Sequence, residues 1–212
     1  MSFKYKVIKK AISYELANFC FNYLKLKKDA VSFMYQTKLV NENPFLGTWK
    51  DEQIPNTYSH YGDFVMETLL LKLLPNLEKE IQLELVPTYS YTRIYKKGDE
   101  LKRHKDRSGC EISTTLNLGG DKWSIFIDPT GGINNPKGVE VKLDVGDMLV
   151  YSGCDLEHWR KPFQGEICCQ VFLHYNNKKG TFKNKYDGRP ILGVPVNIKI
   201  KDFQTGLKNN QF

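Results

Sequence analysis

VPTYSYTRIY (residues 86–95) is the first of several short β-rich segments that alternate with turn signals up to residue 175. The other segments are EISTTLNL (111–118), KWSIFID (122–128), VEVKL (139–143), GDMLVYSG (146–153) and ICCQVFLHY (167–175). All are rich in the β-branched and aromatic residues that favour strands. The breaks between them are rich in Gly, Asn and Pro, and none contains the helix that a parallel crossover needs. Residues 85–176 are therefore predicted to form an antiparallel sandwich or barrel of six strands.

Two helices are predicted before this stretch. Residues 13–35 carry apolar residues at helical spacing after a capping Ser13, and a second apolar stripe follows Asp63, with a kink expected at Pro75. We expect both helices to pack outside the strands. One structural domain is predicted, with residues 1–84 as a helical support region, 85–176 as the β core and 177–212 as a basic C-terminal extension.

Length and composition restrict the class of protein. The chain has 212 residues, of which 41% are hydrophobic, so it can bury a core without disulfides or a structural metal. Its five cysteines form no C-x-x-C pair, and an odd number favours a reducing compartment. The sequence shows neither a signal peptide nor an apolar run long enough for a membrane span, and the cytoplasm is the expected location.

The net charge of +7 makes nucleic acid a partner to consider. However, residues 1–40 and 178–212 each carry a net charge of +6, whereas the residues between them carry −5. The positive charge therefore lies outside the predicted β core. This distribution makes a long phosphate-binding groove across the core less favourable than the total charge suggests.

A metal site is predicted from three residues. His104 and Asp106 are separated by one residue, so in an extended chain both side chains point the same way. His158 lies further along, where an antiparallel sheet can return the chain to the same place. Two histidines and one carboxylate make the facial triad of non-heme Fe(II) oxygenases, although Mn(II), Co(II) and Ni(II) suit the same ligands. The competing interpretation of His104 and Asp106 is a surface ion pair.

The order of these motifs resembles a known family, the 2-oxoglutarate- and Fe(II)-dependent dioxygenases, and in particular the small bacterial and viral proteins of its prolyl 4-hydroxylase-like branch. The matching motifs are Arg93-Ile94-Tyr95-Lys96-Lys97-Gly98, His104-Lys105-Asp106, Thr114-Thr115-Leu116-Asn117, Gly119-Gly120, Gly146-Asp147-Met148-Leu149-Val150, and His158 with Pro162. The resemblance implies a mainly β fold with flanking helices. In this fold a double-stranded β-helix barrel of the jelly-roll or cupin-like type packs against N-terminal helices.

The resemblance also implies an activity. Fe(II) would be held by His104, Asp106 and His158, with 2-oxoglutarate and O2 as co-substrates and ascorbate as a stimulating reductant. The expected reaction is hydroxylation of an unactivated C–H bond. A prolyl or other amino-acid or peptidyl residue is the leading substrate, and no membrane partner is expected.

The chain departs from its relatives where they bind the distal carboxylate of 2-oxoglutarate. Prolyl hydroxylases usually supply Lys or Arg nine or ten residues after the distal histidine, and no basic residue lies there in this chain. Arg160 shares a strand side with His158, so it is the first choice, and Arg93 is the second. Tyr95 and Thr115 would add hydroxyl donors. The competing interpretation is that Arg160 pairs with Glu157 or Asp155 at the barrel rim.

Three other readings of the function stay open at this point. They are an oxygenase that modifies nucleic-acid bases, an oxygenase of another small molecule, and a non-catalytic metal-binding barrel of the cupin type. The remaining strand histidine, His174, is predicted to be a packed or edge residue, because the triad is already complete without it.

Overall fold

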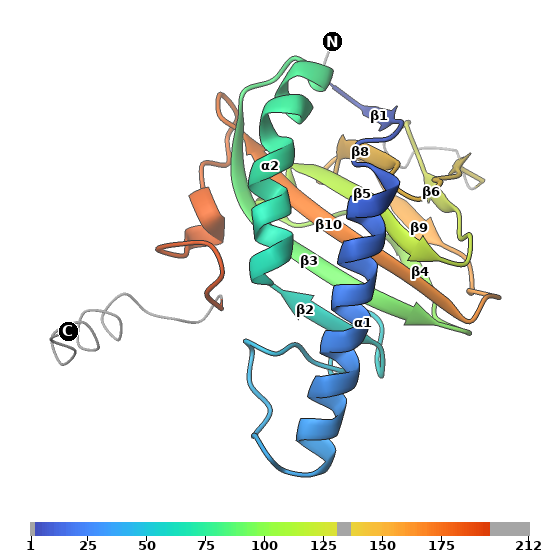
Figure 1. Cartoon of the computed structure of the whole chain (residues 1–212). Coiled ribbons are helices and arrows are strands. Elements are labelled where there is room, and N and C mark those ends of the chain that lie inside the picture. The colour runs from blue at the N-terminus through green and yellow to red at the C-terminus, as the bar shows by residue number, and fades with distance from the viewer. Residues whose placement is uncertain (1–2, 131–136, 196–212) are drawn as a thin grey trace, which may run out of the picture.

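Two antiparallel sheets make up most of the protein, and the computed structural model describes residues 3–130 and 137–195 of it (Figure 1). The larger sheet has the strand order β1-β8-β5-β10-β3-β2. Its strands, in chain order, are β1 (Tyr5–Ile8), β2 (Tyr58–Tyr61), β3 (Leu85–Lys96), β5 (Ile112–Gly120), β8 (Met148–Ser152) and β10 (Ile167–Asn177). The smaller sheet has the order β4-β9-β6-β7, with β4 (Leu101–His104), β6 (Ile125–Ile127), β7 (Val139–Val141) and β9 (His158–Arg160).

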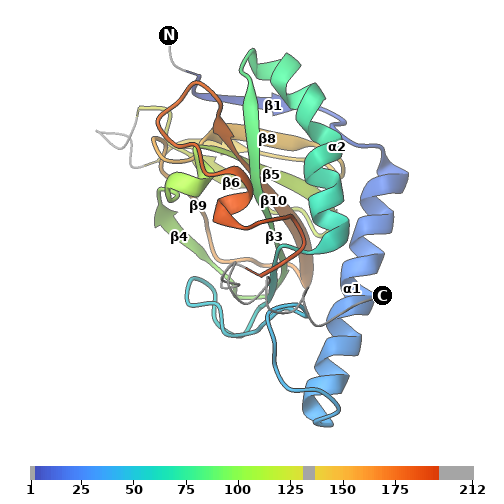
Figure 2. The ribbon, with the colours of Figure 1, turned by 90° about the vertical axis from the view of Figure 1, so that its left-hand side faces the viewer.

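Two helices cover the outer face of the larger sheet (Figures 1 and 2). Helix α1 (Tyr14–Gln36) begins at Ser13, whose hydroxyl accepts a hydrogen bond from the Leu16 N–H. Helix α2 (Phe64–Ile81) begins at Asp63, whose carboxylate accepts from the N–H groups of the second and third helical residues, and it continues through Pro75. Their buried stripes join the outward side chains of β5, β8 and β10 in one apolar core.

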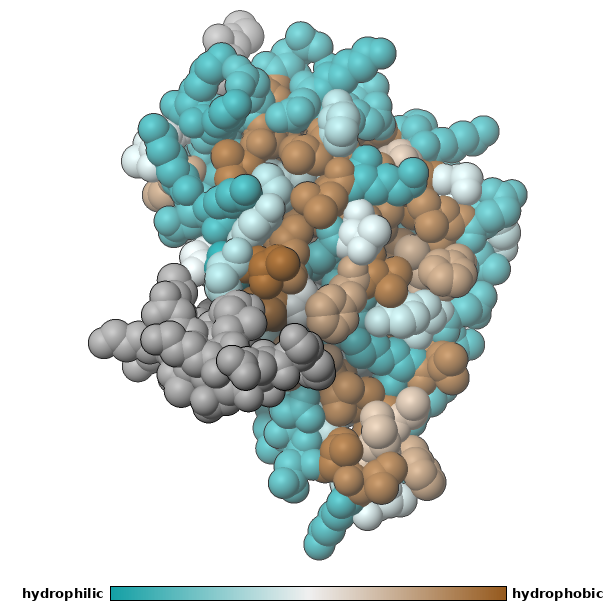
Figure 3. All heavy atoms as spheres, turned by 60° about the vertical axis from the view of Figure 1, so that its left-hand side comes forward, coloured by the Kyte–Doolittle hydropathy of each residue, from teal (hydrophilic) through white to brown (hydrophobic). Residues whose placement is uncertain are grey.

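Some apolar side chains of the two helices stay exposed, among them Phe19, Leu26 and Leu71. In the face drawn in Figure 3, such brown side chains lie among teal hydrophilic ones. No helix in the described ranges combines the length and the apolar character that crossing a bilayer requires.

The space between the sheets is closed by two further apolar clusters. One joins β6 and β7 to Leu149 and Tyr151 of β8, and the other joins Leu101 of β4 to Tyr95 and Phe172 of the larger sheet. These clusters hold the two sheets together and leave polar side chains between them. The site described below lies there.

Two antiparallel sheets and two helices agree with the predicted mainly β class, but among the described residues the sheets of the predicted jelly-roll barrel do not close into a barrel. Within the described residues the two sheets share no hydrogen-bonded ladder, and the edges of the smaller sheet, β4 and β7, have four and three residues. The described part of residues 85–176 contains eight strands rather than the predicted six, because the six predicted segments do not include β4 and β9, although His158 and Arg160 are expected to share a strand. Residues 1–84 supply β1 and β2 as well as the helices. The division of the chain at residues 84 and 176 stays a prediction.

Candidate metal centre and cavity

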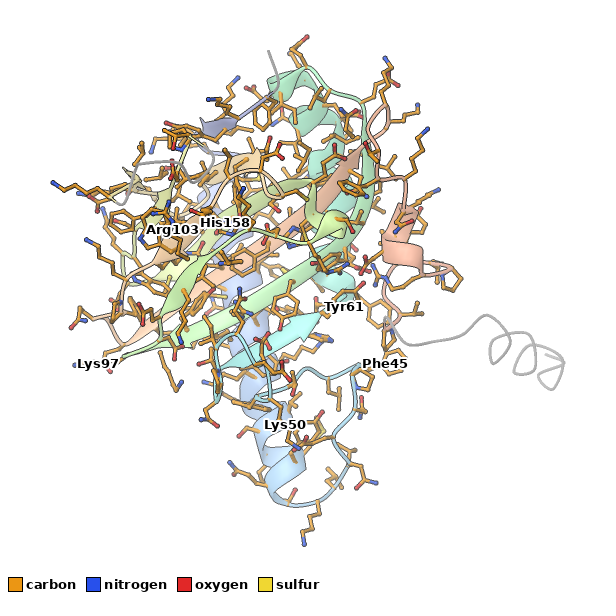
Figure 4. All side chains as sticks on the ribbon, turned by 180° about the vertical axis from the view of Figure 1, so that it is seen from behind. Phe45, Lys50, Tyr61, Lys97, Arg103 and His158 are labelled. Carbon is orange, nitrogen blue, oxygen red and sulfur yellow. The ribbon has the colours of Figure 1, made fainter. Side chains whose placement is uncertain are left out.

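His104, Asp106 and His158 converge between the sheets. His104 ends β4 and His158 begins β9, and the two residues face each other as partners in the ladder. Their ring centroids are 4.2 Å apart, and the Nε2 atom of each lies 3.5 Å from Oδ1 of Asp106. The three side chains thus offer ligand atoms within 4.8 Å of one another. Figure 4 shows His158 on the side of the larger sheet that faces away from α1.

Backbone carbonyls fix both imidazoles in the tautomer that binds a metal through Nε2. Nδ1 of His104 donates to the Lys102 carbonyl at 2.7 Å, and Nδ1 of His158 donates to the Leu156 carbonyl at 3.2 Å. Because a carbonyl only accepts, each Nδ1 carries a proton and Nε2 is the ring atom that faces Asp106 and can bind a metal. Burial lowers the pKa of His158 to about 4, against the opposing charge of Asp106, so this ring is neutral near pH 7.

Hydrogen bonds to the second carboxylate oxygen orient Asp106. Its Oδ2 accepts from the Ser113 hydroxyl at 2.6 Å, and that hydroxyl lies 3.1 Å from Nδ1 of His174. Burial alone would raise the pKa of Asp106, but hydrogen bonding to His104 and the nearby histidines hold it well below its usual value. The carboxylate is therefore charged and oriented, as a metal ligand must be. Two imidazoles that present Nε2 and one carboxylate fit a divalent first-row metal ion.

A cavity of about 340 Å³ opens beside these three residues. Side chains from β3 enter it in alternation, because successive residues of a strand face opposite sides. Tyr89, Tyr91 and Arg93 line the cavity, and Tyr95 continues the same inward row behind them. Phe172 and His174 of β10 lie opposite Tyr91 and Tyr89 in the ladder and line the cavity too.

Arg160 lies at the Tyr95 end of this row and is only 1% exposed. One terminal nitrogen donates to the Trp123 carbonyl at 2.5 Å and the other to the Thr115 hydroxyl at 3.2 Å. Its Nε and the Tyr95 hydroxyl are buried without a hydrogen-bond partner among the described residues. No carboxylate in the described ranges pairs with Arg160, and Glu157, its expected rim partner, binds Arg103 at 2.6 Å instead.

Burying a cation beside a hydroxyl that has no hydrogen-bond partner costs free energy, unless an anion binds to both groups. The free donors of Arg160 and Tyr95 therefore fit a carboxylate, whereas the Thr115 hydroxyl already donates to Oε1 of Gln170 at 3.1 Å. Arg93, the second candidate, already has one, because its terminal nitrogen binds Asp51 at 2.9 Å.

Two residues that sequence reasoning missed reach the centre from the loop before β2. Oδ1 of Asp51 accepts from the Gln53 N–H at 2.8 Å, which turns the chain and brings the Gln53 amide within 3.0 Å of Nε2 of His104. Neither residue belongs to a periodic pattern. His174 was predicted as a packed or edge residue. It is indeed buried, with its ring 4.6 Å from that of Tyr89, and it also borders the cavity.

Comparison with known proteins supports the fold. No protein-family model matches the chain, and no curated protein matches it in sequence. Several solved structures do match in fold, and three of them are compared with the chain. The carbocyclase SnoK from nogalamycin biosynthesis, described as non-heme and alpha-ketoglutarate-dependent, aligns with a TM-score of 0.60 and 11% identity over 93% of this chain and 90% of its own.

The second is HygX from Streptomyces hygroscopicus, solved with nickel and 2-oxoglutarate bound. It gives a TM-score of 0.56 and 14% identity over 85% of each chain. The third is the viral collagen prolyl hydroxylase vCPH from Paramecium bursaria Chlorella virus-1, in complex with 2-oxoglutarate. It gives a TM-score of 0.53 and 11% identity over 81% of this chain and 95% of its own.

The chain has the fold of the 2-oxoglutarate-dependent non-heme oxygenases. This confirms the predicted resemblance at the level of fold. Sequence identities of 11–14% show a shared fold but not a shared function. The function must therefore be argued from the residues of the site.

Proposed function

We propose that the protein is a 2-oxoglutarate- and Fe(II)-dependent dioxygenase that hydroxylates an unactivated C–H bond. One observation carries the proposal. A triad of metal-ligand type lies in the same inter-sheet space as a buried arginine that has no carboxylate partner among the described residues. A structural metal site would be closed by four protein ligands, whereas three ligands beside a cavity suit co-substrates.

His104, Asp106 and His158 would hold the iron, which supplies the chemistry that couples oxidation of 2-oxoglutarate by O2 to oxidation of the substrate. The Nδ1–carbonyl hydrogen bonds keep both Nε2 lone pairs aimed at one place. Arg160, with the Tyr95 hydroxyl, would bind the distal carboxylate of 2-oxoglutarate and so orient the co-substrate, and Thr115, which accepts a hydrogen bond from Arg160, would hold the guanidinium in place. Arg93 is the alternative anchor. Ascorbate would stimulate turnover only by keeping the metal reduced.

A prolyl or other amino-acid residue, free or in a peptide, is the proposed substrate. The tyrosine and phenylalanine rings of Tyr89, Tyr91 and Phe172 line the cavity, and aromatic walls of this kind accept an aliphatic ring such as that of proline. The cavity is at the small end of the range of roughly 300–1,000 Å³ typical of ligand sites, which suits a single residue. The collagen prolyl hydroxylase is one structural neighbour, although SnoK shows that the fold also serves other chemistry.

Nucleic acid is a weaker candidate, because two arginines near the cavity are already paired with carboxylates. Arg107 binds Asp187 through two hydrogen bonds of 2.8 and 2.6 Å, and Arg103 pairs with Asp128 and Glu157. Phosphate binding needs cations that can exchange mobile counterions. We place the protein in the cytoplasm, and the five cysteines, none of which forms a disulfide, agree with a reducing compartment.

Succinate formation from 2-oxoglutarate under air, with Fe(II), tests the proposal. We expect turnover to rise with proline or a proline-containing peptide and not with the same peptide carrying glycine in place of proline. His158→Ala should abolish the rise. Stimulation by a single-stranded oligonucleotide alone would contradict the amino-acid substrate, and the absence of succinate with every substrate class would contradict the oxygenase itself.

A further inference from the structure

A second set of ligand atoms lies on the other side of Asp106. The Asp106 carboxylate, the Cys110 thiol and a ring nitrogen of His174 lie within 4.8 Å of one another. Cys110 ends the short 3-10 helix η1 (Ser108–Cys110), and His174 reaches in from β10. Apart from the triad, no other such set of three is found in residues 3–130 and 137–195.

The set is buried but can be reached. The side chains of Cys110 and His174 are 3% and 6% exposed, and both border the cavity, which gives an ion a way in. Their orientations are fixed by neighbours. The Tyr89 hydroxyl lies 2.9 Å from the Cys110 sulfur, and the Ser113 hydroxyl joins Nδ1 of His174 to Oδ2 of Asp106. Hydrogen bonds of this kind hold the ligands of known metal sites in place.

The donor atoms of this set differ from those of the triad because they include a sulfur. Thiolate, imidazole and carboxylate are the ligands of zinc, and a soft sulfur donor discriminates against the harder Fe(II) and Mn(II). The triad offers nitrogen and oxygen only. The two sets therefore suit different ions although they share one carboxylate.

We propose that Asp106, Cys110 and His174 form a second site that binds Zn(II), with a fourth position open to the cavity, and that this ion competes with the one in the triad. Binding releases the thiol proton to solvent, so the thiolate and the carboxylate neutralise the charge of one Zn(II). A second dication in the triad would share Asp106 and meet uncompensated repulsion. Zinc at this site therefore lowers the affinity of the triad for its own ion.

Cobalt(II) tests the site directly, because a cysteine thiolate bound to Co(II) gives an intense near-ultraviolet charge-transfer band that nitrogen and oxygen ligands do not give. The variant His104→Ala/His158→Ala removes the triad and keeps all three proposed ligands. We expect it to bind one Co(II) per chain with the thiolate band, and Zn(II) to abolish the band. Cys110→Ser should lose the band, whereas Cys154→Ser, at a half-exposed cysteine outside the set, should keep it.

A folded double variant that binds no Co(II), or binds it without the band, would overturn the proposal. So would a band that survives Cys110→Ser. If the double variant does not fold, the single variants His104→Ala and His158→Ala answer the same question, because each breaks the triad and keeps Asp106, Cys110 and His174, so a missing band there excludes Cys110 as a ligand. None of these readouts uses 2-oxoglutarate or turnover, so the zinc site and the proposed oxygenase can fail independently.

Discussion

Replacing Arg160 by methionine should remove 2-oxoglutarate binding while leaving the fold intact. The guanidinium is almost fully buried, contacts only neutral partners in hydrogen bonds, and keeps one nitrogen unsatisfied. A buried cation without an anion contributes little to stability, and exchanging it for an apolar side chain of similar volume is often neutral or stabilising. We therefore expect the melting temperature of Arg160→Met without ligand to be unchanged or higher.

The loss of affinity follows from the hydrogen bonds that a carboxylate would receive. Each charge-assisted hydrogen bond is worth about 1.5–3 kcal/mol. Two of them from the guanidinium amount to about 3–6 kcal/mol, which raises the dissociation constant by about 10²- to 10⁴-fold. Tyr95→Phe removes one neutral donor and should cost less, about tenfold.

Calorimetric titration of 2-oxoglutarate into Mn(II)-loaded protein measures this effect. Lys161→Met is the matched control, since it removes the same charge from an exposed neighbour on the chain. Arg93→Met tests the alternative anchor, whose charge Asp51 already compensates. An unchanged affinity in Arg160→Met, or a larger loss in Arg93→Met, would refute the assignment.

Three further predictions concern the support of the site and the fold. Ser113→Ala removes the hydroxyl that orients Asp106, so Mn(II) affinity, measured by titration, should fall about 10- to 100-fold, and an unchanged affinity would show that the hydroxyl is dispensable. Asp63→Asn weakens the cap of α2 and leaves the half-buried Lys27 ammonium without its carboxylate, which should cost about 2–4 kcal/mol in urea unfolding at pH 7; a cost below 1 kcal/mol would contradict this. Burial would raise the pKa of Asp63, but its hydrogen bonds hold it well below the unfolded value of about 3.9, so the difference between the two proteins is fully present above pH 4 and should shrink as the pH falls below 4. Gly120→Ala places a methyl group against the Ile167 carbonyl at a positive φ of 91°, and thermal unfolding should show a loss of more than 1 kcal/mol.

The parts of the site that could be predicted are those governed by local periodicity. His104 and Asp106 were paired because alternate residues of an extended chain face the same side, and Arg160 was placed with His158 by the same rule. Both helix starts were found because Ser13 and Asp63 are residues that satisfy the free N–H groups of a first turn. The roles of these site residues stay predictions until the measurements above are made.

The missed parts depend on contacts between distant segments. Strands β4 and β9 have four and three residues, and they exist because each supplies the other's hydrogen bonds across more than fifty residues of chain. Asp51 and Gln53 reach the centre through a loop whose shape depends on a carboxylate bound to β3. Cys110 meets His174 only after both sheets have formed. No sequence pattern within a single segment could predict these contacts between distant segments.

If the proposed function is right, one chain binds Fe(II) through the triad and 2-oxoglutarate beside it. Anaerobic titration of metal-free protein with Fe(II) and then 2-oxoglutarate tests this most directly, because the chelated pair gives a visible metal-to-ligand charge-transfer band. We predict the band in the wild-type protein, its loss in His104→Ala, and a much higher 2-oxoglutarate requirement in Arg160→Met. A wild-type protein that binds Fe(II) but shows no band at saturating 2-oxoglutarate would contradict the account.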